Sequence, residues 1–154
     1  MEDKKEELSE SVLIRMNSFI GQTLQGCFRR YYDDHDDFDY DDNLDQELDG
    51  DTFLIFSNSE AIGFYADTEA FSLKVGFNVQ LENTESVEVS KNLFWKNKIG
   101  NSLVDVQLLH SKHRPNPYGI KFILSDGPSF EIVYISESDY TDDAVIIKGG
   151  LYKV

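Results

Sequence analysis

The sequence predicts an α+β fold that is mostly β, with two tandem β-rich repeats in one domain and an amphipathic helix near the N-terminus. Apolar runs rich in Val, Ile, Phe and Tyr recur between clusters of Gly, Pro, Asn, Asp and Ser, as strands recur between turns. The same order of runs occurs in both halves of the chain. The 154 residues, of which 40% are hydrophobic, suffice for a single domain over 1–154 with a substantial core.

The first expected element is an amphipathic helix over Lys5–Ser18. Leu8, Val12 and Met16 are spaced by four residues, which places them on one face of a helix. Acidic residues crowd its beginning, where the helix dipole favours negative charge. We interpret this segment as a helix that packs on a sheet; a partner-binding helix is the alternative.

Each half is expected to contain a short helix followed by about four antiparallel strands. In the first half, the expected strands are Gln22–Tyr32, Phe53–Phe56, Ala61–Tyr65 and Phe71–Val75. In the second half, they are Ser102–Leu109, Gly119–Leu124, Ser129–Ile135 and Ala144–Lys148. Polar turn formers separate the two middle strands of each half, which is the pattern of a hairpin. A short helix within Val87–Lys98, with Ser90 as its N-cap, precedes the second set.

The two halves align as pseudo-repeats over approximately residues 8–76 and 90–150. Apolar positions coincide in two pairs of segments, Ile20–Cys27 with Ile99–Val106 and Phe53–Tyr65 with Lys121–Val133. The alternative to a duplication is that any two strand–hairpin units look alike. With a duplication, the strands form one continuous antiparallel sheet or two sheets, and the first helix covers a face.

The charge balance restricts the kinds of partner. The chain carries 14 Lys and Arg against 29 Asp and Glu, a formal net charge of -15. A field of this sign repels nucleic-acid backbones and anionic membrane surfaces, and it attracts basic proteins. We therefore expect a basic protein partner, no nucleic acid and no membrane.

Residue usage favours a cytoplasmic location. Cys27 is the single cysteine, so no disulfide forms within the chain, which fits a reducing compartment. The acidic start lacks the basic and apolar regions of a secretory signal. No apolar run approaches the roughly 18 residues of a membrane span.

An acidic segment, residues 33–51, is the most unusual feature of the sequence. It contains eleven Asp and Glu and no Lys or Arg. A block of like charges repels itself and buries too little apolar surface to fold alone, so we expect a mobile loop between two strands. The second half has no counterpart of its extra length. Function is often carried by loops, and this loop elaborates one copy.

The acidic segment does not complete a calcium site. Asp45, Glu47, Asp49 and Gly50 fit the first half of an EF-hand loop, but position 12, which requires a bidentate Glu, is Phe56.

Catalytic patterns are sparse elsewhere. His110 and His113 form a His-x-x-His pair without an obvious third ligand. Phosphate-binding glycine motifs and the nucleophile elbow of hydrolases do not occur. Cys27 lies in a predicted strand between apolar neighbours, so we expect a small core residue there. We therefore predict a protein that is not an enzyme and that takes no metal and no cofactor. The alternatives are a small enzyme that uses a carboxylate or the two histidines, and a structural interaction module.

Three further features occur together: single-domain size, acid concentrated in one loop, and the hairpins at Phe56–Phe64 and Leu124–Ile132. In this layout the chain resembles the small acidic immunity proteins of bacterial toxin systems. The resemblance implies an inhibitor that presents carboxylates where a basic toxin or nuclease would hold phosphate. The alternative is that the segment only confers solubility. The expected contact residues, with Phe38 and Tyr40 as aromatic anchors, are Asp33, Asp34, Asp36, Asp37, Phe38, Asp39, Tyr40, Asp41 and Asp42.

Overall fold

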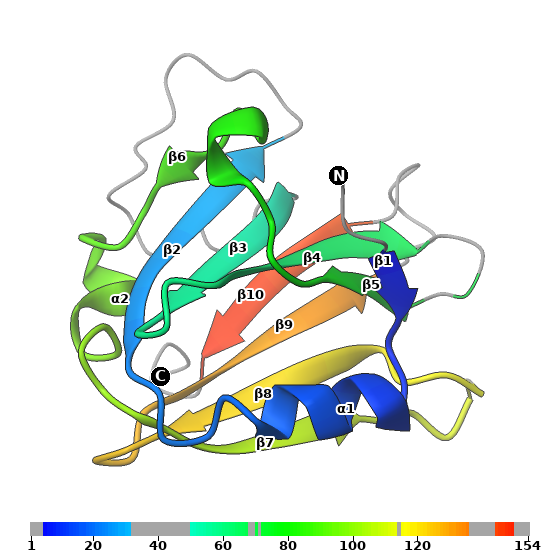
Figure 1. Cartoon of the computed structure of the whole chain (residues 1–154). Coiled ribbons are helices and arrows are strands. Elements are labelled where there is room, and N and C mark those ends of the chain that lie inside the picture. The colour runs from blue at the N-terminus through cyan, green and yellow to red at the C-terminus, as the bar shows by residue number, and fades with distance from the viewer. Residues whose placement is uncertain are drawn as a thin grey trace.

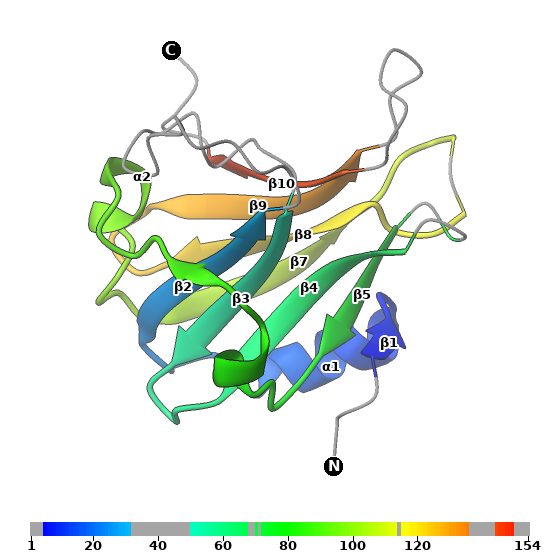
Figure 2. The same ribbon diagram turned by 90° about the horizontal axis from the view of Figure 1, so that it is seen from above.

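Two antiparallel β-sheets lie face to face and form the body of the protein (Figures 1 and 2). The computed structural model describes residues 5–31, 50–67, 70, 72–113, 115–135 and 144–149. The elements are β1 (Lys5–Glu7), α1 (Glu10–Asn17), β2 (Leu24–Tyr31), β3 (Gly50–Phe56), β4 (Ala61–Asp67), β5 (Ser72–Gly76), the 3₁₀ turn η2 (Leu81–Asn83), β6 (Val87–Glu88), α2 (Leu93–Lys96), β7 (Leu103–Leu109), β8 (Gly119–Leu124), β9 (Ser129–Ile135) and β10 (Ala144–Gly149).

The four long strands of each half are neighbours in chain order, and β1 and β6 add the two edges of the first sheet. The six-stranded sheet has the order β1-β5-β4-β3-β2-β6, and the four-stranded sheet has the order β10-β9-β8-β7. The predicted mostly β architecture with antiparallel strands is confirmed, and the strands form two sheets instead of one continuous sheet.

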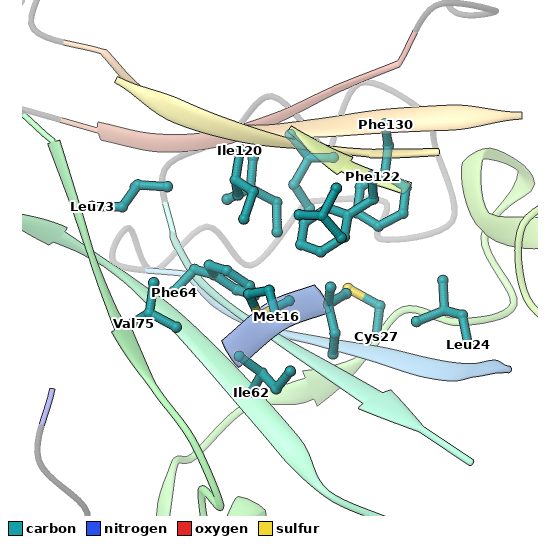
Figure 3. Close-up of a cluster of buried hydrophobic side chains, with 14 of the residues drawn as sticks. Met16, Leu24, Cys27, Ile62, Phe64, Leu73, Val75, Ile120, Phe122 and Phe130 are labelled. Atoms are coloured by element: carbon teal, nitrogen blue, oxygen red, sulfur yellow. The ribbon is translucent and has the colours of Figure 1, made fainter. Parts of the chain in front are cut away.

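The space between the sheets is filled by apolar side chains from both halves (Figure 3). Strand residues alternate between the two faces of a sheet, so Leu54 and Phe56 of β3 point into this core. Phe122 of β8 links the layers. Its ring centroid lies 5.8 Å from that of Phe64 on β4 and 4.9 Å from that of Phe130 on β9. The buried residues of both sheets therefore form one cluster.

The first helix is shorter than the pattern predicted. The expected span began at Lys5, but Lys5–Glu7 forms β1, which pairs with β5 at the sheet edge. The helix α1 begins at Glu10, buries Val12 and Met16, and lies beside β7 (Figure 1). Sheet pairing with β5, distant in the sequence, thus replaces the first turn of the expected helix.

The predicted short helix within Val87–Lys98 is present, but its N-cap differs from the prediction. It spans four residues, Leu93–Lys96, and Asn92 precedes it in the N-cap position. Ser90 is not its N-cap, because the Ser90 hydroxyl accepts a hydrogen bond from the backbone N–H of Cys27 at 2.9 Å and donates one to Glu88 at 2.9 Å. Its oxygen stabilises the edge of β2 instead. In the described part of the chain, no helix is long and apolar enough to cross a membrane.

The two halves have matching contacts where their first strands begin. The Oγ of Ser57 accepts a hydrogen bond from the N–H of Thr23 at 3.0 Å, and the Oγ of Ser125 accepts one from the N–H of Ser102 at 3.0 Å. Thr23 and Ser102 themselves form an isolated bridge. A β-bulge follows in both β2 and β7. Each strand is preceded by a glycine with a φ of +96°, Gly21 or Gly100.

Candidate functional site

A groove of about 510 Å³ lies on the outer face of the six-stranded sheet, away from β7–β10. The connection 77–86 runs from β5 to β6, on the opposite edge, and so passes over one end of this face (Figure 2). Sheet and connection form the two sides of the groove. The lining residues are Lys5, Arg30, Asp51, Phe53, Tyr65 and Gly76 from the sheet, and Asn78, Val79, Gln80, Asn83 and Thr84 from the connection.

Two glycines make room for the floor of the groove. Pairing places Gly76 of β5 beside Gly63 of β4, and Gly63 beside Phe53 of β3. The ring of Tyr65 lies over Gly63. A Cβ atom added to Gly63 would be only 2.5 Å from the Tyr65 hydroxyl oxygen. The Tyr65 ring meets Phe53 edge-on at 5.8 Å between centroids. A glycine at 63 is thus required for the position of Tyr65.

Charged groups of both signs surround this floor. The Lys5 Nζ lies 4.0 Å from the centroid of the Tyr65 ring, a cation–π arrangement. Arg30 is the register partner of Asp51, so their side chains lie on the same face. Asp51 is only 4% exposed. At the rim, Arg30 lies 3.9 Å from the carboxylate of Glu85.

Arg29 anchors the strand that carries Asp51. Its side chain points into the interior and is fully buried. The guanidinium donates hydrogen bonds to the carbonyl oxygens of Gly50 at 3.2 Å and Asp51 at 3.4 Å, and across the sandwich to that of Val145 at 3.3 Å. The beginning of β3 is therefore held to β2 and to β10.

The predicted contact residues, from Asp33 to Asp42, lie outside the described residues, as do Asp45, Glu47 and Asp49 of the calcium pattern. One boundary is corrected. Gly50 and Asp51 were expected in the acidic loop, but they belong to β3, paired with Tyr31 and Arg30. Asp51 is buried because pairing with β2 carries the strand this far.

The other candidates from the sequence are not part of the groove. His110 and His113 are exposed in the connection between β7 and β8, on the other sheet. Within the described ranges, no three His, Cys, Asp or Glu residues are grouped to hold a metal ion. Cys27 is a buried core residue, as predicted. Burial raises the pKa of its thiol well above the usual range, and the positive charge of Arg29 opposes this only in part.

Sequence reasoning missed the groove. Lys5 was expected in a helix and Asp51 in a loop, so nothing placed them on one face. The usable signal was the two-residue period of a strand: if Leu54 and Phe56 face the core, Asp51 and Phe53 face the other way. Compared with protein-family models, curated proteins and solved structures, the chain shows no match.

Proposed function

We propose that this chain is a non-enzymatic cytoplasmic binding protein that neutralises a basic protein, as an immunity protein neutralises a toxin or nuclease. One observation carries the proposal. Residues 33–51 contain eleven Asp and Glu and no Lys or Arg, in a chain whose net charge is -15. Such a concentration of charge speeds association with a basic surface and selects against acidic ones.

The described framework supports this role at the root of the segment. Strands β2 and β3 remain paired up to Tyr31 and Gly50, so the segment leaves and re-enters the sheet at neighbouring positions. Arg29 fixes the β3 side of this root through the carbonyl groups of Gly50 and Asp51. The two ends of the segment are therefore attached to a fixed part of the sheet.

The proposed contacts are the acidic and aromatic residues named from the sequence. Asp36, Asp37 and Asp39 flank Phe38, so a basic cleft would meet carboxylates around one aromatic ring. Aromatic anchors that enter a pocket contribute more to affinity than charges at the rim of an interface. Phe38→Ala should therefore weaken binding more than any single Asp→Asn change.

The test begins with capture of a saturable basic partner from the source cell by the tagged protein. Affinity is then measured for Asp36→Asn, Asp37→Asn and Asp39→Asn combined. We expect a loss of about tenfold at low salt and a smaller loss at high salt, because salt screens exposed charges. The matched control removes three acids from the other sheet: Asp105→Asn, Asp126→Asn and Glu131→Gln. Equal losses in both triple variants, or no saturable partner, would contradict the proposal.

We also propose that the two halves are tandem repeats, each a short helix followed by four strands. The support is the shared start of their first hairpins: the Ser57 and Ser125 hydroxyl groups accept equivalent hydrogen bonds at the same distance. The bulges of β2 and β7 fall at the same step of the register. On this account the acidic segment is an insertion in the first copy, between the strands that correspond to β7 and β8.

A further inference from the structure

The two halves of the chain are joined by backbone hydrogen bonds that repeat each other. Gly21 donates its N–H to the carbonyl oxygen of Leu103 at 2.8 Å, and Gly100 donates its N–H to that of Leu24 at 2.8 Å. Gly100 is the counterpart of Gly21 in the second half, and Leu103 is the counterpart of Leu24. Each half therefore gives the other the contact that it receives.

A second pair of hydrogen bonds at this junction follows the same rule. The N–H of Leu103 is bonded to the carbonyl oxygen of Gln22 at 2.8 Å, and the N–H of Leu24 is bonded to that of Asn101 at 3.0 Å. Gln22 and Asn101 are again counterparts, since each directly follows the Ile-Gly pair of its half. All four backbone contacts are thus reciprocal.

The isolated bridge between Thr23 and Ser102 lies at the centre of these contacts. The two residues occupy equivalent positions in the two halves, and a residue meets its own equivalent where a twofold axis passes. Reciprocal contacts of this kind are isologous, the form in which two identical subunits meet in a homodimer. The halves therefore contact each other here as two subunits do.

The strands are also divided between the halves. Strands β2–β5 come from the first half and lie in one sheet, and β7–β10 come from the second half and form the other sheet. Apolar side chains of both sheets fill the space between them, with Phe64 of β4 against Phe122 of β8 (Figure 3). Neither half contributes a described strand to the sheet of the other, so the sheets can pair without being parts of one chain.

We propose that a second copy of this chain is a partner of the protein, through exchange of halves. The first half of one chain packs on the second half of the other, and the reverse. The exchanged dimer contains the same two-sheet contact twice, so it requires no new surface. The inference rests on the tandem repeat proposed above, which the Ser57 and Ser125 variants test separately, and it does not depend on the basic partner.

The connection between the sheets decides whether a chain closes on itself or on a copy. Val89, directly after β6, donates its N–H to the carbonyl oxygen of Cys27 on β2 at 2.9 Å. The chain therefore crosses from β5 to the far side of β2, which is four strand spacings or about 19 Å. A connection that spans this distance holds the second half near the first, and one that is too short abolishes closure within the chain.

The first experiment shortens the connection. Deletion of Val79–Glu88 leaves two residues between Gly76 and Val89, with a reach of about 11 Å. The matched control replaces the same ten residues with Gly and Ser, so it loses the same side chains but keeps the reach. Light scattering measures the mass of both proteins. We expect the shortened chain to have twice the mass of the control, with the same β content by circular dichroism.

The second experiment uses chains of native length. Thr23 and Ser102 form a non-hydrogen-bonded antiparallel pair, because the bonds flanking them come from Leu24 and Leu103. The Cα atoms of such pairs lie about 4.5 Å apart, within the range of a disulfide. One chain carries Thr23→Cys and the other carries Ser102→Cys. The two are unfolded together, refolded and oxidised, and only exchange brings the introduced thiols together.

The expected yield follows from competition with closure of each chain on itself. Halves linked by a short connection have an effective concentration of about 1 mM. About a tenth of the chains should therefore exchange on refolding at about 0.1 mM, and about tenfold fewer at about 0.01 mM. Mass spectrometry identifies the disulfide between positions 23 and 102. Each variant refolded alone is the control, and it also reports any reaction of Cys27.

Three results would overturn the proposal. The first is a shortened chain that folds as a monomer, because its halves would then pair without exchange. The second is the absence of the disulfide between positions 23 and 102 at both concentrations, which decides the matter even where the shortened chain does not fold. The third is a cross-linked fraction that does not change with concentration, or that is equal when either variant is refolded alone.

Discussion

Shortening the acidic segment tests whether the sheets fold independently of it. Deletion of Asp34 to Asp45 leaves six residues between Tyr31 and Gly50, where the native chain has 18. Tyr31 and Gly50 are register partners at the end of the β2–β3 pair, so a short connection can join them. If the segment contributes no packing, the shortened protein keeps its fold.

Two effects set the expected change in the free energy of unfolding. Each doubling of loop length costs about 0.6 kcal/mol in closure entropy, so a threefold shortening stabilises the fold by about 1 kcal/mol. The deletion also removes seven Asp, which takes the net charge from -15 to -8 and relieves self-repulsion. In a chain of this size, about 1 kcal/mol raises the melting temperature by about 2–4 °C.

Thermal melts of the intact and shortened proteins at low salt and at about 1 M salt measure the two effects. At 1 M the Debye length is about 3 Å, so the repulsion is screened and the entropic gain remains. A full-length variant with the same seven Asp changed to Asn isolates the charge. If the shortened protein is less stable, or does not fold, the reasoning is wrong and the segment is part of the folded structure. The same melts with calcium then show whether its carboxylates hold a cation.

Three further predictions concern the framework. Phe122→Ala should cost about 3–5 kcal/mol and leave a single unfolding transition in urea, since this buried ring joins both sheets; separate transitions, or a cost as small as that of exposed Val104→Ala, would refute the single core. Ser57→Ala and Ser125→Ala should each cost about 0.5–1.5 kcal/mol by the same assay, because each removes the acceptor of one backbone N–H; a marked inequality would argue against equivalent halves. Burial lowers the pKa of Lys98 from 10.5 to about 8, so the unfolded chain binds more protons between these values and stability rises with pH in this window. Denaturation at pH 8 and at pH 10.5 measures the free energy of unfolding of the native protein and of Lys98→Met. The native protein should gain stability relative to the variant as the pH rises, and a constant difference would contradict the lowered pKa.

Local patterns were most informative where strands are adjacent in sequence. The hairpin of β8 and β9 was predicted at Gly119–Leu124 and Ser129–Ile135, and the structure has the same bounds. A turn of Ser, Asp, Gly and Pro joins two alternating runs there, so all the information lies within 17 residues. Cys27 was placed correctly in the core for the same kind of reason, its apolar strand neighbours.

The groove could not be predicted in the same way. Lys5 enters it because β1 pairs with β5, some 70 residues later in the chain. The periodic apolar residues from Leu8 onward favoured a helix that included Lys5, and this local preference loses to the backbone hydrogen bonds offered by the edge of β5. Asp51 enters it because β2 and β3 remain paired to their ends, although the surrounding composition favours a loop.

By itself the sequence determined the β-rich class, most of the strands, the buried cysteine and the concentration of acid between the first two long strands. These follow from alternation, turn residues and charge, which are properties of neighbouring residues. The tertiary structure decided that the strands form two sheets, which strands take the edges, and which outward-facing side chains share a groove. Those outcomes depend on pairings between segments far apart in the chain, such as Lys5 with Gly76 and Arg30 with Asp51. The local sequence determines which side chains of a strand face the core, but the strand that pairs with it depends on the rest of the fold.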